Sequence, residues 1–94
     1  MSKVTLKGFI TVPPEDLNGV LDELPNHIAL TEQEPGCLVF KVIQDADEQC
    51  RFTVYEEFDN KASFEAHQSR VRSSKWSQIT GNVTRHYTIE GAQV

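Results

Sequence analysis

Four segments of this chain alternate apolar and polar residues with a period of two, and two stretches with helical spacing lie between them. The alternating segments span residues 3–12, 37–44, 50–58 and 83–90. Such alternation predicts β-strands with one buried face, whereas apolar residues three or four apart predict amphipathic helices. The resulting order, β-α-β-β-α-β, is that of the split βαβ or ferredoxin-like plan. We therefore predict an α+β fold in which four antiparallel strands form one sheet and both helices cover one face.

The first helical stretch follows Pro13-Pro14-Glu15-Asp16, which ends a strand and favours a helix start. Its apolar stripe comprises Leu17, Val20, Leu21, Leu24 and Ile28. Pro25 lies inside this stretch and removes one backbone hydrogen bond, so we expect a kink or a short break there. Glu34-Pro35-Gly36 is a typical stop signal for the helix.

The second helical stretch begins after a cap at Asp59 or Asn60 and is weakened between Ser69 and Ser74. Trp76 continues the apolar stripe beyond this weak part. We therefore expect two helical pieces, about 61–69 and 73–80, joined by a bend.

A polar stretch, residues 45–49, has a suitable length for a hairpin loop between the second and third strands. Centring the turn on Asp47 pairs Phe40 with Val54 and Val42 with Phe52 on the apolar face. The same register places Glu56 opposite Leu38 on that face. A carboxylate there either has a raised pKa or finds a cation, unless it reaches water at the end of its strand.

Length and charge limit the possible partners. The chain has 94 residues and a formal net charge of −5, so we expect a single domain spanning residues 1–94 and no binding to nucleic acid, which needs a basic face. The one basic cluster, Lys61, Arg70, Arg72 and Lys75, is more typical of solvated cations near a helix end. The longest apolar run, residues 37–40, is too short to span a membrane or to form a signal peptide, and we expect no membrane partner.

The two cysteines, Cys37 and Cys50, fall at opposite ends of the predicted hairpin, roughly 20 Å apart at about 3.3 Å per residue. We expect them to be free thiols. Free thiols suit a reducing compartment, and we expect a cytoplasmic protein.

The sheet face that the helices leave uncovered is predicted to carry Phe9, Val39, Ile43 and Tyr55 among Thr and Lys residues. This face is too apolar to stay wholly exposed to water. A second copy packed sheet to sheet would cover it, so we predict a homodimer.

Two histidines border the apolar stripes of the helices. His27 has Thr31 four residues away, and His67 has Arg70 three residues away, which could meet an anion or an oxygen-bearing substrate. Either histidine could act as a general base, although a histidine satisfied by a backbone carbonyl is an equally good interpretation of His27. We expect His67 at the edge of a pocket, where its replacement by Ala would leave the melting temperature nearly intact.

Two aromatic residues, Phe64 and Trp76, have the spacing of core residues, but they could also wall a site for a flat aromatic substrate. The strong cofactor signatures are missing, because the chain has no Gly-rich phosphate loop, no paired Cys motif and no His spacing suited to zinc. We therefore expect no metal, flavin or haem to copurify.

Three segments resemble the antibiotic-biosynthesis monooxygenase family: the E-P-G-C-L-x-F run of residues 34–40, the Y-E pair of residues 55–56, and the F-x-A-H motif of residues 64–67. The likeness extends from the first strand to Tyr87. It implies a dimeric α+β barrel with a pocket between the helices and the sheet of each subunit.

The resemblance also implies a range of activities. Some members oxidise quinols or polyphenols with dioxygen and without a cofactor. In that scheme His67 or His27 would take a phenolic proton, and Arg70 or Glu56 would orient the ring. Haem-degrading members use an Asn on the first strand together with a Trp and a later His in the second helical region. Trp76 is present here, but the first strand has no Asn and no His follows Trp76 before the last strand, which argues against haem degradation. Others isomerise carbonyl compounds, bind small ligands or have no known activity, and these remain the alternatives.

Overall fold

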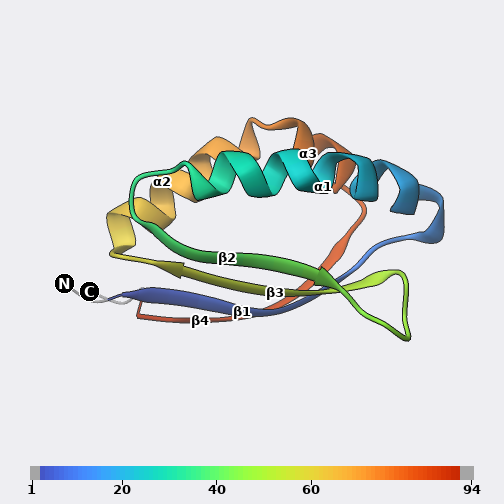
Figure 1. The fold of residues 1–94 in the computed structure, drawn as a ribbon, viewed down its shortest axis with the longest axis horizontal. Helices are drawn as coiled ribbons and strands as arrows, with labels where there is room; N and C mark the ends of the chain where they lie inside the picture. The colour runs from blue at the N-terminus through green and yellow to red at the C-terminus, as the bar shows by residue number, and fades with distance from the viewer. Residues whose placement is uncertain (1–2, 92–94) are drawn as a thin grey trace.

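Residues 3–91 are described by a computed structural model, in which helices cover one face of an antiparallel sheet (Figure 1). The elements in chain order are β1 (Val4–Thr11), the 3-10 turn η1 (Pro14–Asp16), α1 (Leu17–Glu32), β2 (Cys37–Gln44), β3 (Arg51–Phe58), α2 (Lys61–Arg72), α3 (Lys75–Ile79) and β4 (Thr84–Glu90). The strands lie in the order β2-β3-β1-β4 with antiparallel pairing throughout. The predicted ferredoxin-like α+β fold is thereby confirmed.

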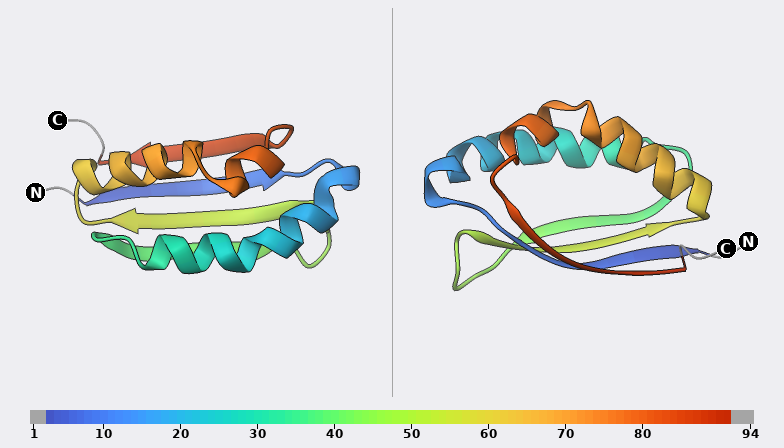
Figure 2. Two further views of the ribbon diagram at one scale, coloured as in Figure 1. Left: turned by 90° about the horizontal axis from the view of Figure 1, so that it is seen from above. Right: turned by 180° about the vertical axis from the view of Figure 1, so that it is seen from behind.

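The helices form one layer over the sheet, in which α1 lies beside α2 and α3, as the view from above shows (Figure 2). α1 lies over β2, whereas α2 and α3 run antiparallel to it on the other side. The opposite face of the sheet carries no element of the described chain (Figures 1 and 2). The sheet is therefore open on one side, as the alternation of its strands predicts.

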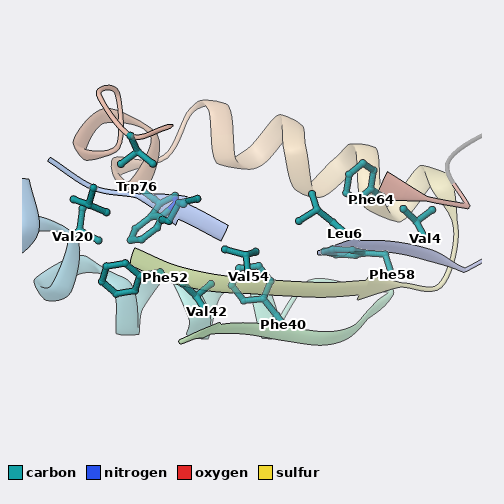
Figure 3. Close-up of a cluster of buried hydrophobic side chains, with 13 residues drawn as sticks. Val4, Leu6, Val20, Phe40, Val42, Phe52, Val54, Phe58, Phe64 and Trp76 are labelled. Carbon is teal, nitrogen blue, oxygen red and sulfur yellow. The ribbon is translucent and has the colours of Figure 1, made fainter. Parts of the chain in front are cut away.

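The hydrophobic core lies between the sheet and the helices (Figure 3). It consists of residues on the inner faces of the strands together with a few from the helices, and includes Val4, Leu6, Ile10, Phe52, Phe58, Val20 and Trp76. The predicted inner face of the first strand is fully confirmed, since Val4, Leu6, Ile10 and Val12 are each at most 3% exposed. This packing orients the inner faces of the strands toward the helices, where the candidate site residues also lie.

The first helix differs from expectation in two respects. It is continuous from Leu17 to Glu32, so the break predicted at Pro25 is absent. Only one backbone bond is lost at a proline, and packing of the helix on the sheet retains the helical path. The predicted apolar stripe is confirmed at Val20, which is buried, and at Leu17, Leu24 and Ile28, which pack against the core. Leu21 differs, since it is 37% exposed, and His27 and Thr31 are buried in addition.

The second helical region confirms the expected two pieces with a break between them. α2 runs to Arg72, three residues beyond the predicted end, because the weak propensity of its serines is overridden by packing. Asn60 is the N-cap, and its side chain accepts a hydrogen bond from the Ser63 N–H at 2.8 Å. Ser74 caps α3 in the same way through Ser77 N–H.

The predicted hairpin register is wrong by two residues. Phe40 faces Glu56 and Val42 faces Val54, instead of Val54 and Phe52. The turn is centred one residue later, because the Asp45 side chain accepts hydrogen bonds from the N–H groups of Asp47 and Glu48 at 2.8 and 3.0 Å. A shift of two leaves the side chains of the regularly paired residues on their predicted faces, so the apolar and polar sets of residues 39–44 and 51–57 are unchanged.

The pairing changes by one residue near the start of β2, at an irregularity between Cys37 and Val39. Leu38 lies at this bulge and is 55% exposed, so it does not face Glu56 as expected. Both cysteines, Cys37 and Cys50, are free thiols as predicted. Among residues 3–91, no helix has the length and apolar character needed to cross a membrane.

Candidate active site

A cavity of about 280 Å³ lies between the helices and the inner face of the sheet. Its walls come from all four strands and all three α-helices, and they include the apolar side chains Leu6, Ile10, Phe40, Val42, Val54 and Val71. Trp76 adds an aromatic wall, and the polar side chains on the cavity are His27, Glu56, His67, Gln68, Thr80, Arg85 and Tyr87. A cavity with apolar walls and convergent polar groups is the usual form of a small-molecule site.

His67 of α2 lies on this cavity and is held on its far side by a carboxylate. Its Nδ1 is 2.7 Å from Oε1 of Glu34, and its ring lies 4.9 Å from the Phe58 ring and 5.7 Å from the Phe40 ring between centroids. Only 4% of the residue is exposed. The expectation of an edge position is therefore wrong, because Glu34 from the turn after α1 reaches across to α2 and the turn covers the ring.

Glu56 of β3 faces the other ring nitrogen. Its Oε1 is 3.8 Å from His67 Nε2, which is too long for a hydrogen bond, and this oxygen is buried without a partner. Burial raises the pKa of Glu56 to about 7, and the nearby Glu34 charge adds to the rise. Burial lowers the pKa of His67, although its hydrogen bond to Glu34 opposes the change. An acid that is half neutral near pH 7 thus faces the imidazole ring of His67.

His27 of α1 lies on the opposite side of the cavity from the sheet, flat against the Trp76 indole. The two ring centroids are 4.4 Å apart with an interplanar angle of 4°, and the His67 ring is 6.4 Å away. Burial, together with the charges of His67 and Arg70, lowers the pKa of His27 to about 3, so the ring is neutral at physiological pH. Its Nδ1 is buried without a hydrogen-bond partner. The two histidines converge, as their helices predict.

Arg70 and Thr31 do not line the cavity. The Arg70 guanidinium donates from Nε to Glu34 Oε2 and from Nη2 to Thr31 Oγ1, the latter at 3.0 Å. Thr31 in turn donates to the carbonyl of His27 at 2.8 Å. These two residues therefore link α1, Glu34 and α2 by hydrogen bonds on the side away from the cavity. Their polar groups bind other residues of the protein and not a substrate.

Phe64 also lies away from the cavity. Its ring packs on Phe58 in an edge-to-face arrangement, with centroids 5.9 Å apart, and it belongs to the core (Figure 3). Of the two aromatic candidates, only Trp76 lines the cavity. Phe64 is therefore a core residue alone, whereas Trp76 both belongs to the core and forms a wall of the cavity.

Three residues of the site were not singled out by the sequence analysis. Arg85 and Tyr87 line the cavity from β4, and the alternation of that strand does place both on one face. Burial raises the pKa of Tyr87 to about 12, although 38% of the residue remains exposed. Glu34 was interpreted as part of a helix stop, and no local pattern indicates that its carboxylate reaches His67 some thirty residues later.

Within residues 3–91, no group of three or more His, Cys, Asp or Glu side chains is placed to hold a metal ion. The absence of a cofactor stays a prediction.

Several solved structures share the fold. A candidate antibiotic biosynthesis monooxygenase from Nitrosomonas europaea is 21% identical, with a TM-score of 0.77 over 95% of this chain and 88% of that chain. The protein PA3566 from Pseudomonas aeruginosa is 25% identical, with a TM-score of 0.73 over 96% and 91%. MupZ from Pseudomonas fluorescens is 14% identical, with a TM-score of 0.78 over 97% and 73%. No curated protein matches the chain in sequence.

The model of one protein family matches residues 4–78, which is most of the chain and includes β1, both histidines of the cavity, Glu34 and Glu56. That family is described as antibiotic biosynthesis monooxygenase. The match is consistent with the E-P-G and F-x-A-H motifs, since Glu34 of the first and His67 of the second are in contact. This chain belongs to the antibiotic biosynthesis monooxygenase family.

Proposed function

We propose that this protein is a cofactor-independent monooxygenase that oxidises a small quinol or polyphenol with dioxygen. Membership of the family supports monooxygenase chemistry. The observation that carries the proposal is the pair of buried polar atoms without partners, His27 Nδ1 and Glu56 Oε1, from residues of a cavity that also has apolar and aromatic walls. Buried polar atoms are normally satisfied, so a ligand with hydroxyl groups and an apolar ring would suit both features.

The chemistry starts with a proton transfer. A phenolic hydroxyl gives its proton to Nε2 of His67, which becomes an imidazolium, and the electron-rich phenolate then reacts with dioxygen. One oxygen atom ends as a new hydroxyl on the ring and the other leaves as water. A quinol and dioxygen give a hydroxyquinone and water, so the substrate supplies all four electrons.

Other groups would support this step. Glu56 in its neutral form would donate a hydrogen bond to a substrate oxygen, because its pKa of about 7 keeps a large fraction protonated at neutral pH. His27 is neutral and could accept one at Nδ1, while the Trp76 ring supplies a flat wall beside it. A cavity of about 280 Å³ lies at the small end of ligand sites and suits a compact substrate.

The test is His67→Asn, whose amide can keep a donor near Glu34 while it removes Nε2. Oxygen uptake with a hydroquinone should fall by about 10²–10⁴-fold, the usual effect of losing a general base. Glu65→Gln, at an exposed position of the same helix, is the control and should leave the rate unchanged.

Two outcomes would contradict the proposal. An unaltered rate in folded His67→Asn would remove His67 from the mechanism. A parent protein that consumes no oxygen with any quinol, but binds quinols or their carbonyl analogues, would establish the alternative function of a ligand-binding or carbonyl-isomerising protein.

We also propose that the protein is a homodimer in the cytoplasm. Ile43 on the open face of the sheet is 59% exposed, and His86 of the edge strand β4, which stacks on Phe9 of the same face, is exposed as well. A second copy on this face would cover both features. The cytoplasmic location is supported by the two free thiols, which suit a reducing compartment.

A further inference from the structure

Glu34 is fixed in place by its backbone as well as by its side chain. Its N–H donates to the Thr31 carbonyl at 3.0 Å, and its own carbonyl accepts from Cys37 N–H at 3.2 Å. The following Gly36 accepts a hydrogen bond from Asp59 N–H at 2.8 Å, which ties the turn to the start of α2. A side chain on such a turn has little freedom to move away from its partners.

The two oxygens of the Glu34 carboxylate have different partners. Oε1 lies 2.7 Å from His67 Nδ1, and Oε2 accepts from Arg70 Nε. Arg70 is in turn held by Thr31, so the carboxylate is anchored on the side away from the cavity. An ionised carboxylate has no hydrogen to donate, and the imidazole must therefore carry its proton on Nδ1 to make this bond.

The consequence falls on the other ring nitrogen. With the proton on Nδ1, Nε2 keeps its lone pair and faces the cavity beside Glu56 Oε1, 3.8 Å away. The opposite tautomer would present an N–H to the cavity and could not accept a proton there.

We propose that Glu34 is the positioning residue of this site, which holds the His67 proton on Nδ1 so that Nε2 faces the cavity as the proton acceptor. The catalytic part of this inference rests on the proposed function, whereas the tautomer itself does not. Glu34 does not line the cavity; it contacts His67 directly, and its charge also contributes to the raised pKa of Glu56.

The anchoring by Arg70 makes Glu34→Gln a sharp test. Arg70 Nε needs an oxygen, so the amide oxygen of the Gln faces Arg70 and its NH₂ faces His67. That NH₂ donates to Nδ1 and drives the imidazole proton to Nε2. The variant keeps the size of the side chain yet reverses the tautomer.

The measurement is a long-range ¹H–¹⁵N correlation spectrum of protein with ¹⁵N-labelled histidine at neutral pH, with the His67 signals assigned through His67→Asn. We expect a protonated Nδ1 and an unprotonated Nε2 in the parent, and the reverse in Glu34→Gln. Oxygen uptake should show kcat lower by at least about 10²-fold with KM nearly unchanged. Glu32→Gln, an exposed acid two residues earlier, is the control and should change neither result.

A parent spectrum with the proton on Nε2 would overturn the proposal without any variant. A folded Glu34→Gln that keeps the parent tautomer would overturn it as well. Should the parent consume no oxygen with any quinol, the proposed oxygenase function fails, but the tautomer still decides whether Glu34 positions His67.

Discussion

Glu56 is the residue whose ionisation is most changed by the fold. It is 7% exposed, it lies opposite Phe40 in the sheet, and its Oε1 has no partner. Burial favours the neutral carboxyl and raises its pKa from 4.5 to about 7. Its alternation with Val54 and Phe58 on the inner face of β3 indicates this position from the sequence alone.

This shift makes a prediction for stability against pH. Below pH 4.5 the carboxyl is neutral in both the folded and the unfolded chain. Between pH 4.5 and about 7 only the unfolded chain ionises, so Glu56 lowers the free energy of unfolding as the pH rises. The loss approaches a limit on the order of 3 kcal/mol above pH 7.

Glu56→Gln removes this ionisation, so its stability relative to the parent should increase from pH 4.5 to 7 and then level off. Urea unfolding of both proteins between pH 4 and 8 measures the difference. The exposed Glu65→Gln on α2 should follow the parent at every pH. A pH-independent difference between Glu56→Gln and the parent would contradict the assigned pKa.

At the scale of elements, the turn between α1 and β2 decides the geometry of the site. Gly36 in this turn has a φ of +87°, a conformation that residues with a side chain rarely adopt. A Cβ at this position would also overlap the side chains of Ser63 and Asp59 at the start of α2, which would have to move. The turn carries Glu34, so its path determines whether the carboxylate reaches His67.

We predict opposite effects for the same substitution at two glycines. Gly36→Ala should lower the free energy of unfolding by about 1–3 kcal/mol through backbone strain alone, and it should reduce oxygen uptake because Glu34 is displaced. Gly19→Ala in α1 meets nothing within 4 Å and should raise stability by about 0.5–1 kcal/mol, since Ala is the better helix former. Thermal melting of the two variants checks both signs. A stabilised Gly36→Ala would disprove the role of this turn.

At the scale of the whole molecule, helices cover one face of the sheet, and no other part of residues 3–91 covers the opposite face (Figures 1 and 2). The open face carries the stacked rings of Phe9 and His86, 4.5 Å apart, and the Arg51 guanidinium lies 3.8 Å from the Phe9 ring centroid. Together with Ile43 and Tyr55 these groups form a mixed apolar and aromatic surface. Such a surface suits a symmetric interface better than exposure to water.

The proposed dimer makes a simple prediction. Light scattering at micromolar concentration should give twice the chain mass of 10.6 kDa, about 21 kDa. Ile43→Lys places a charge in the proposed interface and should shift the protein toward monomer. Leu21→Lys, at an exposed apolar position of α1, should leave the dimer intact. A parent of monomer mass would exclude this interface.

The sequence by itself determined the order of elements, the inner face of each strand and the convergence of two histidines on one side of the sheet. These features follow from periodicities of 2 and 3.6, which are local and survive small errors such as the register shift of two residues. It also placed Glu56 on the apolar face, because the parity of a strand does not depend on which partner lies opposite.

Only the tertiary structure decided which candidates share the cavity and which hold it in place. Arg70 binds Glu34 and Thr31 rather than the cavity, and Phe64 lies in the core. Arg85 and Tyr87 complete the cavity from the edge strand β4. Glu34 lies 33 residues from His67 in sequence, yet its carboxylate makes the bond that orients the ring. Contacts of this kind depend on how a turn packs against a distant helix, and packing of that sort leaves no periodic trace in a sequence.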